Sequence, residues 1–233
     1  MAKVHAGLAK HGDAWFAMEQ TGGKGQRGNK WYTGSGKNIA ISIVVKPSFL
    51  FIKSQFKLSA AVALACYDFF IKYAGDETCI KWPNDIYWRD RKAGGILIEN
   101  VIGNPANRES LENKWKYAVI GIGININQAR FDASLKNPVS LKQITGKEFD
   151  VVALAKELQQ TVLQHISGLE KSSFQQILQR YNQCLYRLNE HVRLKKKDIE
   201  FETIIKGVTE NGQLYTTDII DNYFDFGEVE WIL

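Results

Sequence analysis

Residues 38–45 read NIAISIVV, and residues 54–74 read SQFKLSAAVALACYDFFIKYA. The first stretch is rich in β-branched side chains, which predicts a buried strand. In the second, apolar residues recur at three- and four-residue spacing, which predicts one long helix that ends at Gly75. The patterns of this strand and this helix are strong, and the other elements are predicted before and after them in the sequence.

Further strands are predicted on both sides of this pair. Two helical stripes are also expected, one through Val151 and one through Phe174. Because strands do not alternate regularly with helices, we expect an α+β fold, in which a mixed, mainly antiparallel sheet carries helices on one face. The predicted additional strands of this sheet lie at residues 14–19, 78–82, 86–88, 96–101 and 116–126.

The last part of the chain has a different hydrophobic pattern. From His191 onward short alternating runs return, with an Asn211-Gly212 hairpin turn and a last strand predicted at residues 228–233. A tail of about 45 residues is too small for a large core and predicts a small β-barrel that docks on the main domain. We therefore expect two domains, at residues 1–187 and 188–233.

Composition excludes several classes of protein. The 233 residues are 45% hydrophobic and 24% charged, which is typical of a globular chain and not of a disordered, collagen-like or disulfide-rich one. The three cysteines are widely spaced and predict thiols in a reducing compartment. No apolar run reaches the ~18 residues that span a bilayer, so we expect a cytoplasmic protein without a membrane segment.

A glycine-rich loop at residues 22–31, GGKGQRGNKW, is the most unusual stretch. Gly23, Gly25 and Gly28 satisfy the G-x-G-x-x-G spacing, but the residues that follow are poor helix formers, so we reject a dinucleotide-binding site. A phosphate-binding P-loop also fails, because Asn29 stands where its lysine is needed. A basic loop remains that can offer backbone N–H groups and cations to an anion, unless it is a plain surface turn.

Three other stretches carry unusual polar residues. They are KWPND at residues 81–85, RKAGGILIE at 91–99 and IGIGININ at 120–127. Each of the first two can also be an ordinary turn. Glycines inside a predicted strand, as in the third, indicate close approach of a ligand or of another backbone.

Together, in this order and spacing, these four stretches closely resemble the biotin protein ligase family. The resemblance covers essentially the whole chain, and the tail is similar to the family's small SH3-like C-terminal domain. It implies a class II synthetase-like catalytic domain that joins biotin to ATP, giving biotinyl-5′-AMP. It also implies transfer of biotin to a lysine of a biotin carboxyl carrier protein, of acetyl-CoA carboxylase or a related carboxylase.

The resemblance also assigns roles to residues. Lys92 is the implied catalytic cation between two anionic substrates, and Asp85 orients the target lysine or accepts its proton. Mg²⁺ is implied for the triphosphate, with no protein ligands assigned. Gln26 stands where the family usually has arginine, so we expect weaker retention of the adenylate. The implied biotin contacts are Gln20, Lys24, Gly25, Gln26, Lys92, Gly94 and Gly95, and the implied adenylate contacts are Arg27, Trp31, Asn84 and Asn125.

Alternatives stay open beside this interpretation. A lipoate or octanoyl ligase or transferase of the same superfamily is one, and a non-catalytic biotin-binding module is another. The ligase motifs begin by residue 20, so we expect no DNA-binding domain and no nucleic acid partner; a homodimer is possible. The family's first strand and its Ser-Thr-Asn turn have no counterpart before Gln20, so we expect weaker biotin binding than in an upstream-extended chain.

Overall fold

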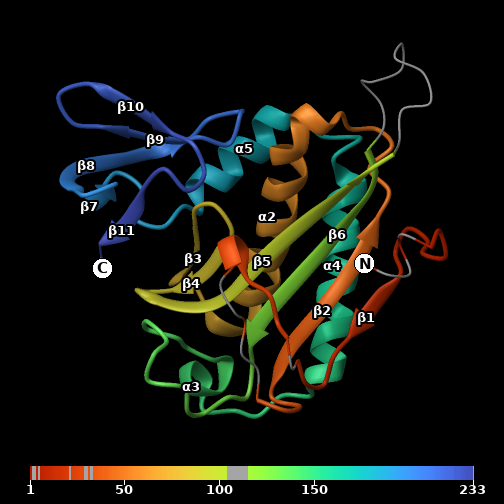
Figure 1. Ribbon diagram of the computed structural model, residues 1–233. Helices are drawn as coiled ribbons and strands as arrows, with labels where there is room; N and C mark the ends of the chain where they lie inside the picture. Colours follow the sequence, from red (N-terminus) through yellow and green to blue (C-terminus); the bar gives the residue numbers. More distant parts are fainter. Residues whose placement is uncertain are drawn as a thin grey trace.

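The computed structural model describes residues 1, 4, 6–20, 22–28, 31, 34–103 and 115–232, with only the backbone of Arg27. Its larger part is a six-stranded sheet with the strand order β1-β2-β6-β5-β4-β3 (Figure 1). Each neighbouring pair in this order is antiparallel. The strands are β1 (Ala14–Phe16), β2 (Asn38–Val45), β3 (Thr78–Lys81), β4 (Asp85–Trp88), β5 (Arg91–Ile102) and β6 (Trp115–Asn125).

Helices cover one face of this sheet, as predicted. Isoleucines alternate along β2 and β6, and Ile39, Ile43, Ile120 and Ile124 are fully buried against the helices. Each buried side chain of this kind stabilises the fold by about 1.5–3 kcal/mol. Figure 1 shows α2 and α4 crossing behind the sheet. The helices are α2 (Gln55–Ala74), α3 (Leu141–Thr145), α4 (Val151–Gly168) and α5 (Phe174–Gln183).

The opposite face of the sheet carries small side chains at its centre. Ser42 of β2 lies beside Gly121 of β6, and Gly123 lies between Ala40 and Gly95. Because successive side chains of a strand point to opposite faces, these residues alternate with the isoleucines of the core. Small residues at the centre of the sheet leave a hollow there, and this hollow positions the candidate site.

A second sheet follows, with the strand order β10-β9-β8-β7-β11. It is joined to the main sheet at the tip of the β8–β9 hairpin, where the indole N–H of Trp82 donates to the carbonyl oxygen of Gly212 at 2.9 Å. Gly212 has φ +86°, and a Cβ there would lie 2.7 Å from the ring of Phe56, so only glycine fits. The strands are β7 (His191–Lys196), β8 (Ile199–Val208), β9 (Leu214–Thr217), β10 (Asp221–Phe224) and β11 (Glu230–Ile232).

Some predicted elements have different bounds. Strand β1 ends at Phe16 and not at residue 19, while β5 begins at Arg91 and not at residue 96. Helix α3 was not predicted, because five residues are too few for a periodic pattern; a capping box at Ser140 starts it. Among the described residues, no helix combines the length and hydropathy that crossing a bilayer requires.

Candidate functional site

The hollow on the open face of the main sheet is a cleft of about 290 Å³. Its floor is formed by strands β2, β5 and β6, and the glycine-rich loop forms one wall. Asn84 in the β3–β4 turn and Asp85, the first residue of β4, complete the lining. The cleft brings together nine of the residues that the sequence predicted: Gln20, Lys24, Gly25, Gln26, Trp31, Asn84, Asp85, Lys92 and Gly95.

The indole ring of Trp31 packs against the floor of the cleft. A Cβ at Gly123 would come within 2.3 Å of the indole ring, so the ring reaches this position only because residue 123 is glycine. The backbone N–H of Trp31 donates to the carbonyl oxygen of Gly23 at 2.9 Å, which closes the loop on itself. The indole Nε1 is buried without an acceptor in the described part of the chain. Trp31 therefore contributes an aromatic ring to the lining of the cleft.

Lys92 and Asp85 form an ion pair inside the cleft, with 2.7 Å between Nζ and Oδ1. Their side chains are 35% and 21% exposed, so both remain accessible to a bound molecule. Asp85 is paired in register with Gly95, and a Cβ at residue 95 would lie 3.6 Å from the lysine Nζ. The glycine thus leaves the space above the pair open. A cation and a proton acceptor side by side can serve a reaction between two anions and then a reaction of an amine.

Gln26 and Asn84 converge on one carbonyl group of the floor. Their side-chain amides donate to the carbonyl oxygen of Ile96 at 3.3 Å and 2.8 Å. The Oε1 atom of Gln26 is buried and has no donor among the described residues, so it can accept a hydrogen bond from a ligand. The loop's neighbouring cation, Arg27, was also predicted to touch the adenylate, but its side chain lies outside the described part of the chain.

Two predicted residues do not line the cleft. Asn125 is buried, and its Nδ2 donates to the carbonyl oxygen of Val139 at 3.1 Å. Asn125 thereby holds the segment that contains Asn137 and Val139. The backbone N–H of Lys92 donates to the carbonyl oxygen of Asn137 in the same segment. A Cβ at Gly94 would lie 2.8 Å from the carbonyl oxygen of Gly123, so this glycine permits strand packing. Their predicted ligand contacts stay predictions.

A second cavity, the outer part, adjoins the cleft and was not predicted from the sequence. This outer part has a volume of about 450 Å³ and shares Gln26, Asn84, Ile96 and Leu97 with the inner part. Its far wall comes from the second sheet. The Asn211-Gly212 turn was recognised as a hairpin, but nothing in the local sequence indicates that it reaches the site.

Lys81, the first residue of the KWPND stretch, is buried beside the cleft. Its side chain lies on β3 opposite Asp85, and its Nζ lies 3.2 Å from the hydroxyl of Tyr87. The rings of Tyr87, Trp231 and Tyr186 surround the ammonium, with centroids at 4.7, 5.1 and 5.7 Å. Burial lowers the pKa of Lys81 to about 8. Rings from both parts of the chain therefore stabilise one buried cation.

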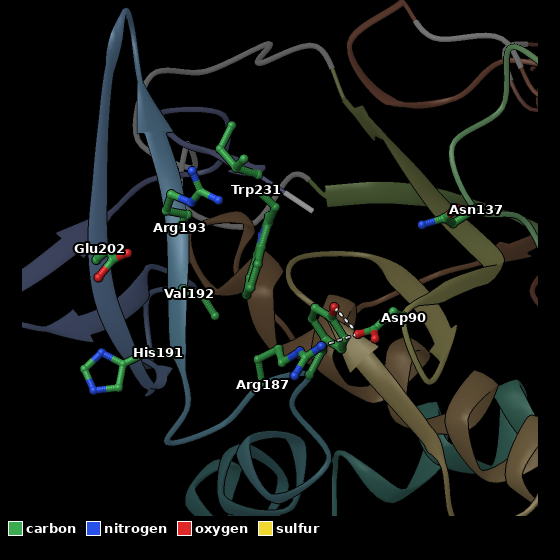
Figure 2. A pocket seen from close by; sticks show the side chains of 10 residues that line it. Asp90, Asn137, Arg187, His191, Val192, Arg193, Glu202 and Trp231 are labelled. Atoms are coloured by element: carbon green, nitrogen blue, oxygen red, sulfur yellow. Dashed lines mark hydrogen bonds and ion pairs between the residues drawn. The ribbon is translucent and has the colours of Figure 1, made fainter.

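A larger cavity, of about 550 Å³, lies between the two sheets. Figure 2 shows Asn137 on one side of it and Trp231 on the other. Arg187 lines this cavity, and its guanidinium group forms ion pairs with Asp90 and with Glu190, each at 2.6 Å. Nine of the predicted site residues line the cleft and none of them lines this cavity, so we place the candidate site in the cleft. Over the described ranges, no group of three or more His, Cys, Asp or Glu residues could hold a metal ion.

Comparison with known proteins identifies the family. The sequence model of the biotin/lipoate A/B protein ligase family matches residues 3–125, which include the first three motifs and most of the fourth. The chain belongs to the biotin/lipoate A/B protein ligase family. This confirms the resemblance that the motifs predicted.

Several members of the ligase family are similar to the chain over most of its length. The bifunctional ligase/repressor BirA of Escherichia coli is 29% identical over 214 residues, which are 89% of this chain and 62% of that protein. The chain thus spans less than two thirds of this relative. The biotin–[acetyl-CoA-carboxylase] ligase of Paracoccus denitrificans is 28% identical over 219 residues, which are 91% of this chain and 86% of that protein.

The solved structures of ligases confirm the fold class. The biotin protein ligase from Aquifex aeolicus in complex with biotin and ATP superposes with a TM-score of 0.78 at 23% identity. The superposition covers 95% of this chain and 89% of the A. aeolicus chain. It therefore includes the second sheet, which lies beyond the residues that the family model matches.

Proposed function

We propose that the chain is an ATP-dependent biotin protein ligase that makes biotinyl-5′-AMP and passes biotin to a lysine of a carrier protein. The observation that carries the proposal is the Lys92–Asp85 pair, held at 2.7 Å beside Gly95 in a cleft that has the glycine-rich loop as one wall. The relatives support it, because the P. denitrificans protein is named for this activity and the A. aeolicus protein is known in complex with biotin and ATP.

In the first step, the biotin carboxylate attacks the α-phosphorus of ATP, and pyrophosphate leaves. Both reactants are anions, so a cation between them removes repulsion and stabilises the charge that develops in the transition state. Lys92 has this role, and Lys24, exposed at the mouth of the cleft, adds positive charge. ATP enters as its Mg²⁺ complex, in which the metal is bound mainly by phosphate oxygens.

In the second step, the amine of the target lysine attacks the acyl carbon of biotinyl-5′-AMP. A C–N bond forms, the bond from the acyl carbon to the phosphate oxygen breaks, and AMP leaves with the electron pair. Asp85 lies beside Lys92 and is the carboxylate of the pair, so it accepts a proton from the attacking nitrogen and passes it to water.

The remaining assignments are part of the same proposal. Residues 1–187 form the catalytic domain and residues 188–233 the SH3-like domain. The partner is the biotin carboxyl carrier protein of acetyl-CoA carboxylase or of a related carboxylase, and the reaction takes place in the cytoplasm.

One experiment tests the proposal. The purified chain is mixed with biotin, Mg²⁺-ATP and a biotin carboxyl carrier domain, and mass spectrometry follows the gain of one biotinyl group. A carrier domain with arginine in place of its target lysine is the control. Pyrophosphate release with lipoate and not with biotin would show a lipoate enzyme. Biotin binding without pyrophosphate release would show a binding module.

A further inference from the structure

The outer part of the cleft differs from the inner part in charge. The inner part is lined by Lys24 and Lys92 as well as by Asp85 and Glu99. Among the described residues that line the outer part, Asp225 is the only charged one. The inner part thus holds charges of both signs, whereas the single negative charge of the outer part favours a cation.

The outer part has a defined shape, because three contacts hold its far wall. Trp82 donates its indole N–H to Gly212 at 2.9 Å, and its ring meets the ring of Phe226 edge-on at 6.2 Å. The turn at Gly212 lies directly on Phe56 of α2. The wall of the second sheet is thus fixed to the same turn that carries Asn84 and Asp85.

The lining suits a long aliphatic side chain with a cationic end. Phe56, Phe226 and Ile98 offer apolar surface to methylene groups. Asn100 adds a polar amide to this lining, and its side-chain oxygen lacks a donor within the described residues. Asp225 is exposed, and its carboxylate accepts from the neutral amide of Gln213 at 3.1 Å.

We propose that this outer part of the cleft is the entry channel for the target lysine of the carrier protein. The inference rests on the proposed ligase function and adds the route by which the second substrate reaches the adenylate. The ammonium group is attracted by Asp225 and moves inward past Gln26 and Asn84, which the two parts of the cleft share. Beside Asp85 it loses one proton and attacks as the neutral amine; the second proton leaves after the C–N bond has formed.

If the target lysine enters by this channel, a change at its mouth should affect transfer to the carrier protein but not formation of biotinyl-5′-AMP. Changing Asp225 to lysine reverses the charge at the mouth of the channel and leaves the inner part untouched. Asp225→Lys should therefore form biotinyl-5′-AMP within about twofold of the unmodified chain. Transfer to the carrier domain should slow by about tenfold or more, because a rim charge mainly changes association.

The experiment measures each half-reaction separately. Pyrophosphate release with biotin and Mg²⁺-ATP reports the first. Single-turnover transfer from the preformed enzyme–adenylate complex reports the second, once to a biotin carboxyl carrier domain and once to hydroxylamine, a small uncharged nucleophile. Reaction with hydroxylamine should be the same in the variant and in the unmodified chain, because it does not need a channel that attracts a cation.

Two further variants complete the design. Asp198→Lys makes the same charge change in the β7–β8 turn, which lines neither part of the cleft, and should transfer normally. Ser59→Phe adds bulk to the channel from α2 without changing charge, and should also slow transfer to the carrier domain.

The outcomes are distinct. If Asp225→Lys and Ser59→Phe transfer biotin as fast as Asp198→Lys, the channel assignment is wrong while the ligase function stands. If Asp225→Lys lowers the KM for ATP, the outer part holds the triphosphate and the assignment is also wrong. If the unmodified chain releases no pyrophosphate with biotin, the proposed function itself fails.

Discussion

Changing Gly123 to alanine tests whether the floor of the cleft sets the position of Trp31. The added Cβ would lie 2.3 Å from the nearest ring atom, whereas carbon atoms pack at about 3.5–4.0 Å, so the indole must move by at least about 1 Å. Stacking of a base on an aromatic ring contributes about 1–3 kcal/mol. If Trp31 stacks on adenine as proposed, the KM for ATP should rise about 5- to 150-fold.

The matched control is Gly121→Ala, two residues away on the same face of β6. A Cβ there would meet the carbonyl oxygen of Leu97 at 3.5 Å, which is an ordinary contact. This variant should leave the KM for ATP unchanged. Both variants should melt within a few degrees of the unmodified chain, because neither adds atoms to the core between sheet and helices.

A double-mutant cycle gives the decisive result. In a Trp31→Ala background, the additional change of Gly123 to alanine should cause no further rise in the KM for ATP, because the ring it displaces is absent. Steady-state pyrophosphate release supplies all four values. An equal loss in both backgrounds would show that the alanine acts on the ligand directly, and the reasoning about Trp31 would be refuted.

Three further predictions concern charged and polar groups of the cleft and its border. Lys92→Ala should slow adenylate formation by about 10²–10³-fold in a pyrophosphate assay, and a rate within tenfold of the unmodified chain would contradict its role. Gln26→Arg should slow release of biotinyl-5′-AMP from the enzyme, measured by trapping the free adenylate, and unchanged release would contradict the idea. The depressed pKa of Lys81, about 8 against 10.5, means that the folded chain loses this proton first as the pH rises. The free energy of unfolding should therefore gain up to about 3 kcal/mol from Lys81 between pH 8 and 10.5. Lys81→Met should lack this gain in urea melts, and parallel pH profiles of the two proteins would disprove it.

The parts of the fold that the sequence predicted well are those with strong local patterns. Strand β2 covers residues 38–45 as expected, because its β-branched run is uninterrupted. Helix α2 also follows its apolar spacing, from Gln55 to Ala74. The start of β5 was missed, because Lys92, Ala93 and the two glycines carry no strand pattern. They join the sheet through tertiary contacts: β4 pairs with Lys92 and both glycines, and β6 pairs with the two glycines.

The candidate site divides in the same way. Nine residues that line the inner part of the cleft lie within the motifs or next to them, so the order and spacing of the motifs predicted them, whereas Ile41 and Ser42 of β2 lie outside the motifs and were not predicted. The contribution of Gly212 depends on its approach to Trp82, which lies 130 positions earlier. The hydrogen bond from Asn125 to Val139 was not predicted either. A strand pattern indicates to which face of the sheet a side chain points, but not which residue it contacts. Such contacts come from tertiary packing, which local spacing does not encode.

The aromatic cage around Lys81 has a consequence for synthesis on the ribosome. The β3–β4 hairpin can pair as soon as it leaves the exit tunnel, but Trp231, which covers the ammonium group, is translated about 150 residues later, or roughly 8–30 s. Tyr186 is also translated late, so during most of this interval only Tyr87 covers the cation. A ribosome that stops before β11 therefore releases a protein with an open flank beside its reaction centre, which proteases and chaperones can recognise.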